Sequence, residues 1–177
     1  GEHNRALEYY NRCLQILEET SDSKVLSSVL INMGRIYKNI GDYSKALDYY
    51  RRSYEISEEL ADLRGMASVL NSQGSIFMNQ GFYAKALDYY LRSLRIREDI
   101  SDKRGMSAAL NNIGLIYLDQ GFYDKALDYF EQSLVHKEEI ADKNGMAITL
   151  NNIGLIYKRK EDFDKALGYY DRSLAIR

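Results

Sequence analysis

The sequence predicts an all-α fold, a solenoid of antiparallel helix pairs, because one 40-residue segment recurs along it. Aligning Gly41, Gly81 and Gly121 superimposes GDYSKALDYY, GFYAKALDYY and GFYDKALDYF. Residues 81–120 and 121–160 are identical at 24 of 40 positions, which is more than shared helix composition would produce. A period of this length is typical of arrays in which one two-helix unit stacks on the next.

The repeat accounts for the whole chain, so we expect a single solenoid over residues 1–177. Neither end carries the polar capping repeat that a free-standing solenoid needs. We therefore expect a fragment of a longer protein, or a chain that assembles end to end. The expected units are 1–40, 41–80, 81–120 and 121–160, followed by the partial unit 161–177.

Each period contains two amphipathic helices, which we call the first and second helix of a pair, with one turn between them. In residues 110–117 and again in 123–134, apolar or small residues follow at steps of three and four. Gly121 lies between these segments, where a helix end favours a residue with positive φ. An aspartate recurs ahead of each first helix, where its carboxylate can accept backbone N–H bonds: Asp22, Asp62, Asp102 and Asp142.

Small residues predict where the two helices of a pair approach each other. A glycine inside a helix costs about 1 kcal/mol relative to alanine, so its recurrence needs a packing reason. We expect that reason to be close approach of the second helix through a recurring alanine. Cys13 shares its register with a recurring serine, which favours a small buried residue over a reactive thiol. The glycines are Gly34, Gly74, Gly114 and Gly154; the alanines are Ala46, Ala86, Ala126 and Ala166; the serines are Ser53, Ser93, Ser133 and Ser173.

This pattern resembles the tetratricopeptide repeat family. Two departures are the absence of proline and a unit of 40 residues in place of the common 34. The longer unit is similar to repeats of Pins/LGN scaffold proteins, kinesin light chains and bacterial signalling proteins. The resemblance implies a right-handed superhelix whose first helices line the concave side. In the third unit the matching residues are Leu110, Gly114, Tyr117, Gly121, Tyr123, Ala126 and Phe130.

Composition argues against several functions. A net charge of -2 with interspersed signs gives no basic patch for nucleic acid. The uncharged stretch 65–84 contains several amides, so we expect no membrane insertion. One cysteine and two isolated histidines provide no zinc spacing or Cys/His pair, and we expect neither a cofactor nor catalysis. We expect a cytoplasmic chain, or a periplasmic one if the full-length protein has a signal peptide.

The predicted ligand site is a row of side chains on the first helices, next to their core residues. Its positions follow at i, i+4 and i+7, counted from Asn111 in the third unit. Asn71, Asn111 and Asn151 lead it, because an amide offers a donor and an acceptor to a peptide backbone. In the resembling families, asparagines at these positions hold peptides. The alternative is that they bond neighbouring helices and stabilise the stack. The remaining candidates are Asn112, Asn152, Arg35, Lys38, Met78, Leu115, Leu118, Leu155 and Lys158.

We therefore expect a scaffold that binds a peptide or protein segment in a concave groove. The leucines and Met78 would form an apolar strip for a helix or hydrophobic segment, unless stacking buries them. The basic residues would steer an acidic ligand, although isolated surface charges usually contribute little. Two alternatives stay open: a regulatory module of a bacterial signalling protein, and a structural solenoid that forms homo-oligomers through its ends.

Overall fold

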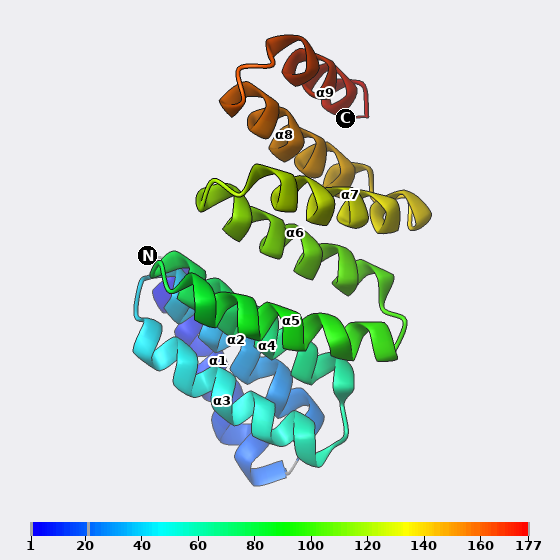
Figure 1. Ribbon diagram of the computed structural model, residues 1–177. Helices are drawn as coiled ribbons and strands as arrows, with labels where there is room; N and C mark the ends of the chain where they lie inside the picture. Colours follow the sequence, from blue (N-terminus) through cyan, green and yellow to red (C-terminus); the bar gives the residue numbers. More distant parts are fainter. Residues whose placement is uncertain (1, 21, 177) are drawn as a thin grey trace. The chain divides into compact units, whose positions relative to one another are not determined.

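The computed structural model describes residues 2–20 and 22–176, with side chains over 5–17 and 22–176. Gly1 and Arg177, the ends of the expected solenoid, lie outside the described residues. Over the described ranges the chain is entirely α-helical, as predicted, and consists of nine helices joined by short turns (Figure 1). They are α1 (Glu2–Thr20), α2 (Ser23–Asn39), α3 (Tyr43–Glu59), α4 (Leu63–Asn79), α5 (Tyr83–Asp99), α6 (Lys103–Asp119), α7 (Tyr123–Glu139), α8 (Lys143–Arg159) and α9 (Phe163–Ile176).

The helix ends follow the predicted chemistry. Each recurring aspartate accepts a hydrogen bond from the backbone N–H three residues later, which satisfies one of the unpaired donors at the start of a first helix. At the other end of these helices, Gly41, Gly81 and Gly121 have φ angles of 84°, 77° and 79°. Both predictions are confirmed. The cap bonds join Asp22 to Val25, Asp62 to Gly65, Asp102 to Gly105, and Asp142 to Gly145.

A second set of left-handed residues was not predicted, because none of them is glycine. Ala61, Ser101 and Ala141 follow the second helices with φ angles of 52°, 53° and 52°. Glu161 takes the place of Gly41 in its unit, with φ of 60°. A residue with a side chain pays about 1–2 kcal/mol in this conformation. The repeat therefore imposes the same turn whether or not its sequence favours it.

The recurring glycines of the first helices are required by aromatic rings. A Cβ atom on Gly114 would lie 2.7 Å from Cε1 of Phe130, and one on Gly154 would lie 2.7 Å from Cε1 of Tyr170. The predicted close approach is correct, but the partner that we expected, a recurring alanine, is wrong. Ala126 is fully buried all the same, in the core of the pair.

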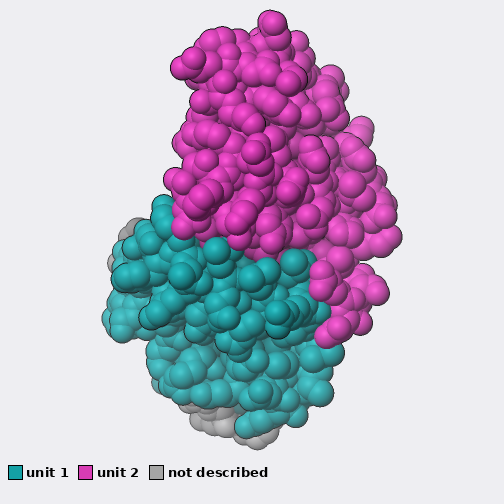
Figure 2. Space-filling model, in the orientation of Figure 1, with its two compact units in different colours: residues 1–96 teal, residues 97–177 magenta. Residues whose placement is uncertain are grey.

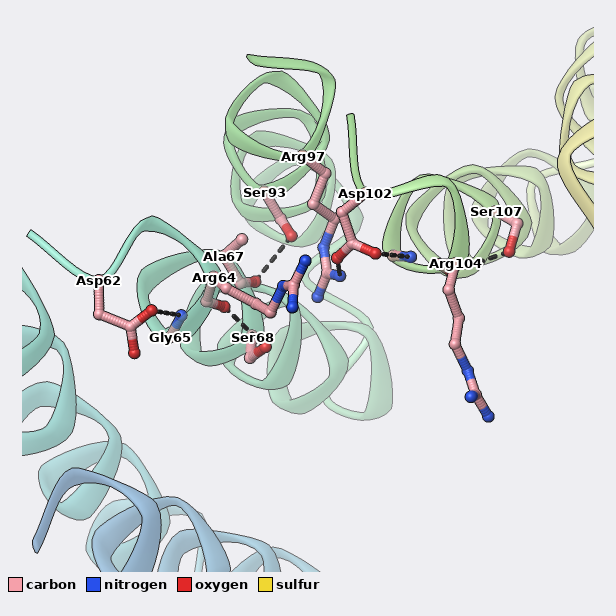
Figure 3. Close-up of polar contacts among 11 residues, drawn as sticks. Asp62, Arg64, Gly65, Ala67, Ser68, Ser93, Arg97, Asp102, Arg104 and Ser107 are labelled. Atoms are coloured by element: carbon pink, nitrogen blue, oxygen red, sulfur yellow. Dashed lines mark hydrogen bonds and ion pairs between the residues drawn. The ribbon is translucent and has the colours of Figure 1, made fainter. Parts of the chain in front are cut away.

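The recurring serines of the second helices are buried and hydrogen-bonded. Ser93 Oγ donates to the carbonyl of Ala67 at 2.7 Å (Figure 3), and Ser133 Oγ donates to the carbonyl of Ser107 at 2.7 Å. Each bond spans 26 residues and joins a second helix to its first helix. Cys13 is exposed, so the expectation of a buried residue is wrong.

The helices gather into two compact units, residues 1–96 and 97–177, which are coloured separately in Figure 2. Unit 1 has a core that includes Ala46, Tyr50, Val69 and Ile76. Unit 2 has its own core, formed by Leu118, Ala126, Phe130, Ile153 and Ile156. The boundary falls within α5. One continuous solenoid over residues 1–177 stays a prediction.

Candidate peptide-binding face

In unit 1 the candidate residues lie on α2 and α4. Arg35 is exposed, whereas Lys38, Asn71 and Met78 are half-buried. Lys38 Nζ reaches from α2 to α4 and donates to Ser75 Oγ at 3.3 Å. Burial, and then the charge of Arg35, lowers the pKa of Lys38 below its usual value. Lys38 therefore joins two first helices, which is a structural role that the sequence did not indicate.

In unit 2 the candidate residues lie on α6 and α8. Asn111 and Asn112 on α6, and Asn151 and Asn152 on α8, are all half-buried. On each helix the two asparagines lie one helical turn before a half-buried leucine, which packs against the core of unit 2. We call the surface formed by these residues the candidate face. It comprises Asn111, Asn112, Leu115, Asn151, Asn152 and Leu155.

The candidate face contains a hydrogen-bonded chain that joins α6 to α8. Asn111 Oδ1 accepts from Thr149 Oγ1 at 3.3 Å and from Asn152 Nδ2 at 3.4 Å. Thr149 Oγ1 accepts from the buried Lys137 Nζ at 2.6 Å. Asn111 thus has the inter-helix role that we considered as the alternative to ligand binding. Among the described residues only its oxygen is engaged, however, so the amide nitrogen keeps its hydrogen-bonding capacity.

One candidate, Leu118, needs correction. Leu118 is 2 % exposed and belongs to the core of unit 2, so it cannot contact a ligand and is withdrawn from the site. The i+7 position of the stripe turns inward here, because Leu118 packs against the following helix pair. Lys158 is exposed on α8. Its neighbour Arg159 donates from Nη1 to the carbonyl of Leu118 at 3.3 Å, which satisfies a backbone acceptor in the last turn of α6.

The structure extends the exposed stripe towards the start of the first helices. Arg104 and Ala108 on α6, and Asn144 and Ile148 on α8, are exposed. The Arg104 guanidinium contacts none of the other residues drawn in Figure 3. Of these, Arg104, Ala108 and Asn144 were missed because the predicted stripe began at the asparagines. The available signal was a recurring basic residue at Lys24, Arg64 and Arg104, four residues before the small residues Ser28, Ser68 and Ala108.

Buried residues at one position of the second helices differ between helix pairs. Arg97, 8 % exposed, pairs with Asp102 at 2.8 Å (Figure 3). Lys137 is the equivalent residue of the next pair and is 6 % exposed, but its hydrogen bond goes to the Thr149 hydroxyl. Burial lowers the pKa of Lys137 below its usual value, and the charge of Asp142 partly opposes this effect. The first pair has the neutral Ser57 at this position.

An open pocket of about 450 Å³ lies beside the turn between α6 and α7. Phe122, Tyr123 and Lys125 line it, and Lys160 Nζ binds Asp124 Oδ1 at its edge, 2.9 Å away. None of the residues of the candidate face lines this pocket. The described side chains contain no cluster of three metal-binding residues. None of the helices over the described ranges is long and apolar enough to cross a bilayer.

Comparison with protein families decides what kind of repeat this is. The family model for the tetratricopeptide repeat matches residues 1–59, 65–134 and 105–177. The chain belongs to the tetratricopeptide repeat family. The resemblance inferred from the recurring glycines and aromatic residues is therefore confirmed, as is the all-α solenoid class. A comparison with curated proteins found no match.

Several solved structures share the tetratricopeptide fold with the chain. BtubC from P. vanneervenii is 24 % identical, with a TM-score of 0.85 over 100 % of this chain and 74 % of BtubC. Aspartyl phosphate phosphatase F from Bacillus subtilis is 20 % identical, with a TM-score of 0.90 over 99 % and 47 % of the two chains. A Rap protein in complex with Competence and Sporulation Factor is 18 % identical, with a TM-score of 0.85 over 99 % and 50 %. The chain thus spans about half the length of the latter two proteins.

Proposed function

We propose that the chain is a protein-interaction scaffold whose first helices bind an extended peptide segment. The proposed ligand contacts in unit 2 are made by the candidate face, with Asn111, Asn151 and Asn152 bonding the peptide backbone. Membership of the tetratricopeptide repeat family supports the general role of protein interaction. A Rap protein of the same fold has been solved in complex with Competence and Sporulation Factor, which supports the capacity of this fold to hold a partner.

The observation that carries this proposal is the state of the amides on α6 and α8. Within the described part of the chain, the Asn111 Nδ2 group and both polar atoms of Asn151 have no hydrogen-bond partner. No fully buried side-chain nitrogen or oxygen of the described residues lacks a partner, so these atoms reach solvent. Amides in a helix interior bring no gain in helix propensity. A peptide backbone offers the donors and acceptors that such groups need.

The half-buried leucines complete the ligand environment. Leu115 and Leu155 pack against the core while keeping part of their surface exposed. They lie at equivalent positions of neighbouring helix pairs, 40 residues apart. An extended segment that bonds the asparagines could place apolar side chains against them. We propose this role for binding and no catalytic role for the chain.

The test is selection of peptides from a displayed random library, followed by affinity measurement on one selected peptide. We expect Asn111→Ala and Asn151→Ala each to weaken binding by roughly tenfold, the equivalent of about 1.4 kcal/mol. Fluorescence anisotropy of the labelled peptide measures the change. Asn111→Ala should leave the fold intact, because Thr149 Oγ1 still donates to the carbonyl of Gly145 at 3.1 Å.

Gln132→Ala is the matched control, since it removes an exposed amide from a second helix, α7. We expect the control to bind the selected peptide as the parent chain does. Equal affinity of the parent and both asparagine variants would place the ligand elsewhere. Failure of the library to yield any binding peptide would count against the function itself.

Self-association is a second candidate, favoured by the exposed apolar residues of α9. Leu167 and Leu174 are 62 % and 67 % exposed, whereas Leu127 and Leu134 at the equivalent positions of α7 are half-buried. A second copy of the chain could cover these leucines. Light scattering over a range of concentrations distinguishes the candidates, because only self-association makes the particle mass rise with concentration. Leu174→Glu should suppress that rise.

A further inference from the structure

Lys137 is an unusual buried cation because its hydrogen-bond partner is a hydroxyl. Only 6 % of the residue is exposed, and its Nζ lies 2.6 Å from Thr149 Oγ1. The equivalent Arg97 instead has a carboxylate, Asp102, at 2.8 Å. An ammonium carries three donors and no acceptor, so Thr149 Oγ1 has to accept the hydrogen bond.

The direction of the remaining bonds follows from that fixed donor. The single proton of Thr149 points to acceptors, and those within reach are Asn111 Oδ1 at 3.3 Å and the carbonyl of Gly145 at 3.1 Å. The buried positive charge of Lys137 also favours the oxygen end of the Asn111 amide on this side, because the NH₂ end carries positive charge. Asn111 Oδ1 then accepts from Asn152 Nδ2, which fixes the second amide.

We propose that Lys137 and Thr149 are positioning residues that set the orientation of the Asn111 and Asn152 amides on the candidate face. The set orientation offers Asn111 Nδ2 as a donor and Asn152 Oδ1 as an acceptor, on adjacent helices. A carbonyl and an N–H of an extended peptide backbone are the complementary groups. This inference rests on the proposed function for its ligand, whereas the orientation itself can be measured without one.

The arrangement joins the α6–α7 pair to the following first helix, α8, and its residue types do not recur at the other repeats, which separates it from general packing. The position of Thr149 is occupied by Val29, Val69 and Ala109 in the other first helices. None of these side chains can accept a hydrogen bond from a cation and also donate one to an asparagine. Asn111 is thus an asparagine whose amide is oriented by a buried cation through a hydroxyl.

The first experiment observes the side-chain amide signals of Asn111 and Asn152 by NMR in the isotope-labelled full chain. Thr149→Val removes the hydroxyl with little change of shape, and Thr149→Ser keeps it. We expect the Val variant and Lys137→Met to shift both amide signals, and the Ser variant to restore the parent positions. Unmoved signals in Thr149→Val and Lys137→Met would overturn the proposal, because the amides would then be oriented independently.

The second experiment is a double-mutant cycle with a peptide selected from the displayed random library. Thr149→Val should weaken peptide binding roughly fivefold in the parent chain and have no further effect in Asn111→Ala. Equal weakening in both backgrounds would show that Thr149 does not act through Asn111, and would overturn the inference. If the amide signals respond but the library yields no peptide, the orientation stands and the proposed function fails.

Discussion

Glycine fills two chemically different positions in each helix pair. Gly121 follows a first helix with φ of 79°, and a Cβ atom there would meet nothing within 4 Å. Gly114 lies inside a first helix, and its Cβ would meet the Phe130 ring at 2.7 Å. The first position is decided by the backbone and the second by the neighbouring ring. At Ala141, which follows a second helix, φ is 52°, so a residue with a side chain adopts the same left-handed conformation there.

We therefore expect Gly121→Ala and Gly114→Ala to destabilise the chain for separate reasons. Gly121→Ala should lower the free energy of unfolding by about 1 kcal/mol, because alanine is strained in the left-handed region. Gly114→Ala should lower it by about 1–3 kcal/mol through overpacking, despite the higher helix propensity of alanine. Urea unfolding measures both. The reverse change, Ala141→Gly, should be neutral or stabilising, and a clear loss there would contradict the strain argument.

The buried cation Lys137 predicts a pH dependence of stability. Because burial lowers its pKa in the folded chain, the unfolded chain holds more protons between that lowered pKa and 10.5. The destabilising contribution of the charge is full below the folded pKa and is relieved as the pH rises through this window. We expect the stability of the parent chain relative to Lys137→Met to increase between neutral pH and pH about 10.5. Urea unfolding of both chains at the two pH values measures this difference, and a constant difference would contradict the prediction.

At the scale of an element, the aspartates that start the first helices have one role in common and one that differs. Asp62 and Asp102 both accept a backbone hydrogen bond that starts a first helix. Asp102 also binds the buried Arg97, and the two side chains are 15 % and 10 % exposed. The cap is a property of the repeat, whereas the ion pair belongs to one helix pair. Asparagine can replace aspartate as a cap but not as a counter-charge.

Replacement by asparagine therefore separates the two roles. We expect Asp62→Asn to change the free energy of unfolding by less than about 0.5 kcal/mol, because the cap bond survives. Asp102→Asn should lower it by about 3 kcal/mol, because Arg97 is left buried without its partner charge. Thermal or urea unfolding of the two variants gives the comparison. Equal effects would mean that the Arg97–Asp102 pair adds nothing beyond the cap.

At the scale of the whole molecule, the interactions are local in sequence. Each serine bond between a second and a first helix spans 26 residues, and the ring beside each packing glycine comes from the same helix pair. The chain forms two compact units with separate cores. Stability in such repeats is approximately a sum over units and their nearest neighbours. A local defect should therefore have a local effect.

Hydrogen exchange measured by mass spectrometry tests this locality. Gly114→Ala should raise exchange in α6 and α7 more than in α2 and α3, because its clash lies in the α6–α7 pair. Gly34→Ala, which clashes with Tyr50, is the matched variant and should reverse the pattern. An equal rise over all helices in both variants would indicate a single cooperative unit in place of local ones.

The sequence by itself determined the helix pairs, the aspartate caps and the glycine turns, because these depend on neighbouring residues that recur in every period. Only the tertiary structure decided which side of a first helix is covered, because that depends on residues 26 to 41 positions away. Leu118 shows this most clearly: it continues the predicted stripe, yet it is buried by the next helix pair. The bonds of Asn111 to Thr149 and Asn152 likewise arise between helices, where periodicity within one helix gives no information.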